Sequence, residues 1–127
     1  MSPGSAPVPW KNQSFPVRLG FALHGLTHAL RTERSLKVQA AALAAVLAAL
    51  VWLRPPAVWW ALVLLASAGV IAAELLNTAI EQLADELNPE AHPRMRLVKD
   101  CAAAAVLVAA AGALGVGLTL ALHLLGR

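Results

Sequence analysis

The stretch from Ala57 to Leu87, AVWWALVLLASAGVIAAELLNTAIEQLADEL, decides the fold of this chain. Its first half is almost wholly apolar, whereas its second half repeats polar side chains at helical spacing. These polar residues are Glu74, Asn77, Thr78, Glu81 and Asp85. On an α-helix, with about 100° between successive residues, they fall within an arc of about 100° and form one polar stripe. The stretch therefore predicts a helix that begins inside a bilayer and carries its polar stripe out of it.

The composition places the whole chain among integral membrane proteins. Of its 127 residues, 59% are hydrophobic and 13% are charged, and the mean hydropathy is +0.67. A soluble domain of this size could not bury so much apolar surface. The net charge of +3 is small and its basic residues flank the apolar runs, so we expect no nucleic-acid partner. The single cysteine, Cys101, lies in an alanine-rich run and is expected to be a small membrane-buried side chain.

The sequence predicts an all-α membrane protein with one interfacial helix and three membrane-spanning helices. Apolar residues recur every three or four positions between residues 15 and 30, which indicates an amphipathic helix lying in the membrane interface. The alternative is that this segment simply extends the first span. The predicted bounds are about 15–32 for the interfacial helix and 36–53, 57–86 and 97–125 for the spans, within one domain of residues 15–127.

Prolines separate the predicted spans. Arg54-Pro55-Pro56 ends the first span, and so short a connection returns the second span antiparallel. Asn88-Pro89 ends the second span, and residues 89–100, PEAHPRMRLVKD, are expected to form a polar connection. The third span carries no charge from Cys101 to Leu125, and its glycines are expected to let neighbouring helices approach closely.

Lysine and arginine are distributed unequally between the two sides of the predicted spans. Eight of them fall beside the N-terminal segment and the second connection, and two fall on the opposite side. This bias puts the N-terminus and the second connection in the cytoplasm. Residues 1–14 are rich in proline and hold no apolar core of a signal peptide, so we expect a disordered cytoplasmic tail.

The polar stripe crosses the cytoplasmic edge of the membrane. At about 1.5 Å per residue, Glu74 lies roughly 26 Å from Ala57, just inside the boundary of an apolar core about 30 Å thick. Glu81 and Asp85 follow one and two turns later, at or beyond the headgroups. A carboxylate inside a bilayer costs about 2.5 to 3.5 kcal/mol on insertion scales and is usually functional. Because paired carboxylates bind Mg²⁺ and Mg²⁺ screens phosphates, the polar stripe predicts phosphoryl transfer to the hydroxyl of a membrane lipid.

The carboxylates near the boundary also have structural interpretations. Glu74 could be protonated and belong to an interhelical hydrogen-bond cluster. Glu33 precedes the first span at the same depth and could complete a metal site with Glu81, or it could form an ion pair with Arg34 or Lys37.

Three residues near the third span have two interpretations each. Lys99 could bind phosphate as a point charge or be an ordinary basic flank of the span. Asp100 could contact the nucleotide or complement the helix dipole at the start of the span. His92 could belong to the site or only shape the loop that carries it.

The same residues resemble a known family. The pattern E-x-x-N-T-x-x-E-x-x-x-D over residues 74–85, followed by Glu90-Ala-His92 and Lys99-Asp100, resembles the small prokaryotic diacylglycerol kinase family, which also contains the undecaprenol kinases. The resemblance covers about residues 15–125. It implies an interfacial helix and three spans that assemble as a homotrimer, with active sites shared between subunits at the cytoplasmic face of the bacterial plasma membrane. It also implies an ATP- and Mg²⁺-dependent lipid kinase.

The resemblance assigns roles by position. Glu74 looks like the general base on the lipid hydroxyl, and Glu33 and Glu81 look like Mg²⁺ ligands. The residues that look like nucleotide contacts are Phe21, Asn77, Glu90, His92, Lys99 and Asp100. Thr78 and Asp85 complete the polar stripe as supporting residues.

The acceptor lipid stays open. Diacylglycerol-specific members tend to carry Glu where Gln39 stands, and the stretches TERSLK (32–37) and NPEAHP (88–93) look closer to the undecaprenol kinases. The product would be phosphatidate or undecaprenyl phosphate accordingly.

Two other classes of protein are weighed against the kinase. A small proton-coupled transporter would place its carboxylate near the midplane, and a purely structural membrane protein would tolerate Glu74→Gln.

Overall fold

The computed structural model describes residues 12–90 and 92–127, and this part of the chain is entirely helical apart from short connections. Its four helices are α1 (Phe15–Thr32), α2 (Arg34–Leu53), α3 (Ala57–Leu87) and α4 (Pro93–Leu125). The predicted all-α class is confirmed. The tail predicted for residues 1–14 lies, over residues 1–11, outside the described residues.

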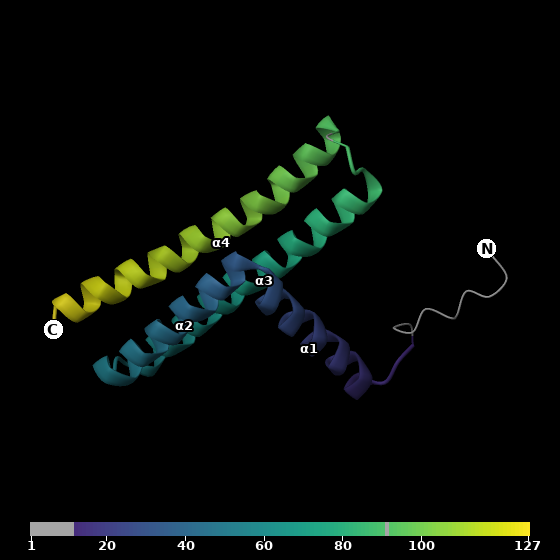
Figure 1. The fold of residues 1–127 in the computed structure, drawn as a ribbon. Coiled ribbons are helices and arrows are strands. Elements are labelled where there is room, and N and C mark those ends of the chain that lie inside the picture. Colours follow the sequence, from purple (N-terminus) through teal and green to yellow (C-terminus); the bar gives the residue numbers. More distant parts are fainter. Residues whose placement is uncertain (1–11, 91) are drawn as a thin grey trace.

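A single residue separates α1 from α2. Glu33 has an extended backbone, with φ −95° and ψ 117°, while its N–H still donates to the Ala29 carbonyl at 2.8 Å. The chain therefore changes direction without losing that hydrogen bond, and α1 points away from the three long helices (Figure 1). The segment does not extend the first span, so that alternative is wrong. Its position in the membrane interface stays a prediction.

Both proline connections end helices as the sequence indicates. Arg54 caps α2 in the left-handed conformation, with φ 49° and ψ 54°, and donates its N–H to the Leu50 carbonyl at 2.9 Å. The following Pro55 and Pro56 have no N–H with which to continue the helix. At the other end, α3 stops at Leu87, and Asn88 donates its N–H to the Ala84 carbonyl at 2.9 Å.

The second connection is shorter than the sequence predicts. Helix α4 begins at Pro93, ahead of residue 97, because a proline fits the first turn, where its missing N–H would have no partner. His92 caps this turn by accepting a hydrogen bond from the Arg94 N–H at Nδ1 (3.2 Å). The stretch PRMRLVKD is therefore helical, and the polar connection is limited to the residues before it.

The three long helices lie side by side, with α3 packed antiparallel along α4 and α2 against α3 (Figure 1). A small core of Leu50, Val63 and Leu120 joins them at the end opposite the second connection. Most other large apolar side chains are exposed, which suits helices surrounded by lipid. All three are long and apolar enough to cross a membrane, so the predicted three-span membrane architecture is confirmed.

The glycines of α4 do not mediate close packing within this chain. A Cβ atom placed on Gly112, Gly115 or Gly117 would meet no atom within 4 Å. The close approach of helices predicted for these positions is therefore absent within the described chain.

Candidate functional site

Glu74 is the buried charged residue of the described chain, with 7% of its surface exposed. It sits on α3 where the apolar half of the helix gives way to the polar stripe, and it faces α2. Gln39 Nε2 donates to its Oε1 at 2.8 Å, and Ser35 Oγ donates to its Oε2 at 3.1 Å. The carboxylate is therefore held by two donors from a second helix, which is the hydrogen-bonding part of the interhelical cluster considered from the sequence.

Glu74 also opens onto a polar cavity of about 330 Å³. Its polar lining comes from the break between α1 and α2 and from the polar stripe of α3, while Ala103 and Val106 of α4 close one side. The polar lining residues are Glu33, Ser35, Glu74, Asn77, Thr78 and Glu81. The fold thus brings Glu33 to the polar stripe, although about forty residues separate it from Glu74 in sequence. We call this space the carboxylate cavity.

The oxygen atoms of the carboxylate cavity suit a hard cation. Asn77 donates through Nδ2 to Glu81 Oε1 at 3.3 Å, and its own Oδ1 is buried without a hydrogen-bond partner. Mg²⁺ is usually held by one or two carboxylates together with waters and substrate phosphates. Within residues 12–90 and 92–127, no three His, Cys, Asp or Glu side chains gather closely enough to hold a metal by themselves. Glu33, Asn77 and Glu81 all line this cavity.

A second cavity, of about 380 Å³, lies between the end of α3 and the start of α4. It is lined by Asp85, Asn88, Pro89, Glu90, His92, Met95, Arg96 and Lys99. Within the described chain Lys99 forms the single ion pair, with Asp85. We call this space the basic cavity after Arg96 and Lys99, which line it together with the carboxylates of Asp85 and Glu90.

The structure bears on some of the structural interpretations considered from the sequence. Glu33 makes no ion pair with Arg34 or Lys37 among the described residues. His92 shapes the start of α4 as its cap, in agreement with the loop-structuring alternative. The first turn of α4 holds no acidic residue, so the interpretation of Asp100 as a carboxylate at the helix start is wrong, since α4 begins well before it.

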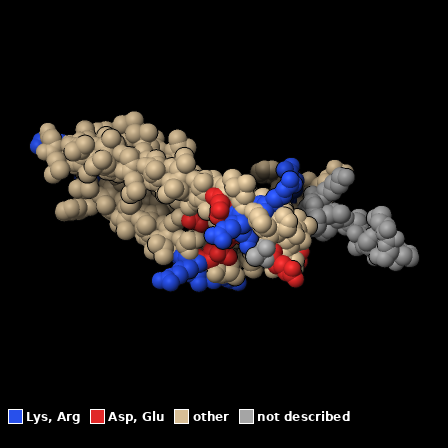
Figure 2. Space-filling model, turned by 90° about the horizontal axis from the view of Figure 1, so that it is seen from above, with Lys and Arg blue, Asp and Glu red and all other residues tan. Residues whose placement is uncertain are grey.

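Two of the predicted nucleotide contacts lie outside both cavities. Phe21 is on α1 with 45% of its surface exposed, and Asp100 is exposed on α4. The polar residues that the fold does assemble lie at one end of the molecule. Figure 2 shows acidic and basic side chains gathered there, beside a long body that is almost free of charge.

Sequence reasoning missed the two donors on Glu74. Ser35 received no role, and Gln39 was noted only as a departure from the resembling family. A signal was present, because Gln39 is the single amide, hydroxyl or charged side chain between Val38 and Leu53. A lone amide in a membrane helix needs a partner.

The comparisons with known proteins agree with this geometry. Residues 20–121 match the family model described as prokaryotic diacylglycerol kinase. The chain is 38% identical over 84 residues to the undecaprenol kinase of Bacillus subtilis, an alignment that covers 66% of this chain and 68% of that protein. It is 36% identical over 102 residues to a diacylglycerol kinase of Synechocystis, covering 80% of this chain and 58% of that protein. The chain therefore spans less than two thirds of the Synechocystis relative.

Proposed function

Since the chain belongs to the prokaryotic diacylglycerol kinase family and is a lipid kinase, we propose that it transfers the γ-phosphate of ATP, with Mg²⁺, to the hydroxyl of diacylglycerol or undecaprenol. The observation that carries the proposal is the placement of Glu74. This carboxylate is buried between α2 and α3 and opens onto the carboxylate cavity at the end of the apolar part of α3. A lipid hydroxyl and a soluble phosphate can both reach that position.

In the proposed reaction Glu74 accepts the proton of the lipid hydroxyl as its oxygen attacks the γ-phosphorus. The bond between the γ-phosphorus and the bridging oxygen breaks, so ADP leaves and the lipid becomes a phosphate monoester. Glu74 then returns its proton to water through the carboxylate cavity. Positioning and charge neutralisation carry most of the catalysis in such transfers, since the phosphoryl group passes through a loose transition state.

The other polar side chains would bind the phosphates. Glu33, Glu81 and Asn77 Oδ1 would hold Mg²⁺, which would supply positive charge to offset that of the phosphates. Lys99, at the basic cavity, would approach the phosphates as a point charge after leaving Asp85. These roles follow the family resemblance and the two cavities together.

We also propose a homotrimer in the bacterial plasma membrane, with the N-terminus and both cavities at the cytoplasmic face. The lysine and arginine distribution supports the orientation. Active sites shared between subunits would account for Phe21 and Asp100, which line neither cavity of a single chain. Gly112 and Gly115 of α4 have no neighbouring atom within 4 Å of an added Cβ, which is compatible with packing against another copy.

Lipid phosphorylation by the purified protein tests the proposal directly. Mixed micelles would contain labelled ATP, Mg²⁺ and either diacylglycerol, undecaprenol or both in competition, with Glu74→Gln as the blank. Label in phosphatidate or in undecaprenyl phosphate identifies the acceptor. Label in neither lipid would refute the proposal and favour a transporter or a structural membrane protein.

A further inference from the structure

The amide of Gln39, within the apolar part of α2, is hydrogen-bonded to Glu74. Gln39 is the single amide, hydroxyl or charged side chain of α2 between Val38 and Leu53, and burying an amide in such surroundings is unfavourable unless it finds a partner. Its Nε2 donates to Glu74 Oε1 at 2.8 Å, a short hydrogen bond to a carboxylate of the kind that is stronger than one between neutral groups.

Ser35 adds a second donor from the same face of α2. It precedes Gln39 by four residues, and residues at that spacing lie one above the other on a helix. Its Oγ donates to Glu74 Oε2 at 3.1 Å. Each carboxylate oxygen thus receives one hydrogen bond from α2, and each keeps lone-pair capacity for a further donor such as a hydroxyl group.

The orientation of the Gln39 amide gives Glu74 a hydrogen bond and leaves the amide oxygen of Gln39 without one. With Nε2 committed to the carboxylate, Gln39 Oε1 is buried without a hydrogen-bond partner. Buried polar atoms without partners are uncommon in folded proteins, and each requires an explanation. Turning the amide round would set its oxygen against a carboxylate oxygen, so the local structure accepts one unpaired atom in order to hold Glu74.

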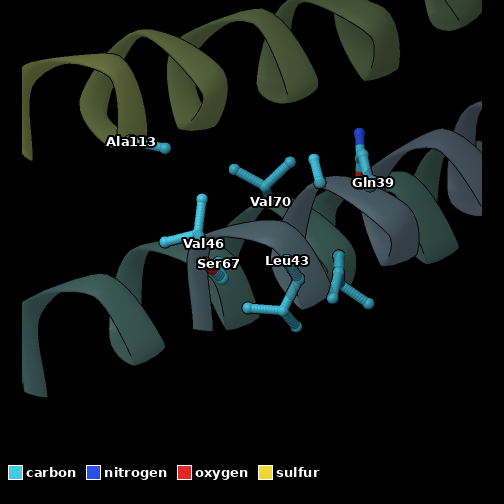
Figure 3. Close-up of a pocket in the computed structure, with 8 residues that line it drawn as sticks. Gln39, Leu43, Val46, Ser67, Val70 and Ala113 are labelled. Atoms are coloured by element: carbon cyan, nitrogen blue, oxygen red, sulfur yellow. The ribbon is translucent and has the colours of Figure 1, made fainter. Parts of the chain in front are cut away.

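Gln39 also stands where the apolar part of the molecule meets the polar part. Figure 3 shows it at one end of a cavity otherwise lined mainly by apolar side chains, including Leu43, Val46 and Val70. It lines as well a longer apolar groove of about 590 Å³ between α2, α3 and α4. On its other side Gln39 contacts Glu74, which opens onto the carboxylate cavity.

We propose that Ser35 and Gln39 are positioning residues for the lipid-phosphorylating base. They fix both oxygens of the Glu74 carboxylate from a neighbouring helix, so that the lipid hydroxyl meets a base that is already oriented. This inference rests on the proposed function, because it assigns a task within the same reaction. A fixed near-attack geometry contributes to the rate of the chemical step and leaves nucleotide binding unchanged.

The test compares variants by their kcat, their KM for MgATP and their thermal stability in micelles. Ser35→Ala removes the hydroxyl donor, and Gln39→Met removes the amide at similar volume. Each should lower kcat by about 10- to 100-fold, the effect of losing one hydrogen bond to a charged group. The KM for MgATP should stay within about twofold. Ser35→Thr keeps the hydroxyl and should retain kcat within about threefold.

A matched control separates this role from simple helix packing. Thr119→Val also removes a hydroxyl, but that hydroxyl bonds only to carbonyls of its own helix, Gly115 and Val116, so kcat should equal that of the wild type. Because Ser35 is exposed, Ser35→Ala should fold even where Gln39→Met does not.

Three results would overturn the inference. In the first, Ser35→Ala and well-folded Gln39→Met have the wild-type kcat. In the second, Ser35→Thr is as impaired as Ser35→Ala. In the third, the loss of activity follows an equal loss of thermal stability, which would mean that the two donors only join α2 to α3. A wild-type protein that labels neither lipid refutes the proposed function and removes this inference with it, and the wild-type reaction alone identifies that case.

Discussion

Replacing Glu74 with Gln should abolish turnover while leaving the fold nearly unchanged. The substitution keeps the size of the side chain and removes the basic oxygen. In the structure Gln39 Nε2 and Ser35 Oγ contact the two carboxylate oxygens. The new amide can present its oxygen to Gln39 and its nitrogen to Ser35, because a hydroxyl group accepts as well as donates. Both interhelical hydrogen bonds therefore survive.

Glu74→Gln should lower kcat far more than it changes the free energy of unfolding. Loss of a general base lowers kcat by about 10²- to 10⁴-fold. Stability loses the extra strength of two charge-assisted bonds but gains from no longer burying a charge, so the net change should stay under about 2 kcal/mol. By contrast, Glu74→Ala leaves Gln39 and Ser35 without their partner and removes buried volume, which should cost about 2 to 5 kcal/mol.

Two measurements on the same purified samples decide the matter. One is the initial rate of lipid labelling in micelles with saturating MgATP, and the other is the midpoint of thermal unfolding. We expect Glu74→Gln to be inactive and to unfold near the wild-type temperature, and Glu74→Ala to be inactive and less stable. If Glu74→Gln kept a rate within about threefold of the wild type, Glu74 would not be the base. If it unfolded as easily as Glu74→Ala, the geometry described for Gln39 and Ser35 would be wrong.

Three further predictions concern the metal, the nucleotide and the core. Glu81→Gln should raise the Mg²⁺ concentration needed for half-maximal activity by about tenfold or abolish activity, since it removes a carboxylate ligand; an unchanged Mg²⁺ titration would contradict that role. Lys99→Met should raise the KM for MgATP by about tenfold, the effect of losing one charged contact. An unchanged KM would mean that Lys99 does not contact the phosphates. Asp85→Asn should change the free energy of unfolding by less than about 1 kcal/mol, because the Lys99–Asp85 pair is largely exposed. Leu50→Ala, at a position 1% exposed, should lower the free energy of unfolding by about 2 to 5 kcal/mol in a denaturant titration. Leu65→Ala, at a position 73% exposed, should stay within about 1 kcal/mol of the wild type. Equal effects of the two substitutions would mean that Leu50 is not part of the core.

The sequence by itself determined the elements and their order. Apolar runs of about twenty residues cross a bilayer as helices, because a helix bonds its backbone N–H and carbonyl groups within its own segment. Arg54-Pro55-Pro56 and Asn88-Pro89 end helices for a local reason, the absence of a donor on proline. The polar stripe on α3 also follows from local periodicity, so Glu74, Asn77 and Glu81 were predictable as neighbours.

Local signals also misled in places. The polar character of residues 89–100 suggested a connection, but charged residues are compatible with helix once Pro93 supplies a first turn and His92 a cap. The glycines of α4 suggested close packing, yet inside one chain nothing approaches them. Residue composition indicates which helix surfaces could pack closely, whereas the arrangement of the helices decides which surfaces are in contact.

Only the tertiary structure decided what surrounds Glu74. Ser35 and Gln39 lie 39 and 35 positions from Glu74 in sequence, and no periodicity of either helix predicts that their donors reach the two oxygens of one carboxylate. That pairing depends on the connection at Arg54-Pro55-Pro56, which returns α3 along α2. The candidate site residues on α3 could be identified from the sequence around each of them. Their mutual distances were fixed by the packing of helices that are remote in the chain, and those distances determine whether a buried carboxylate can act on a lipid.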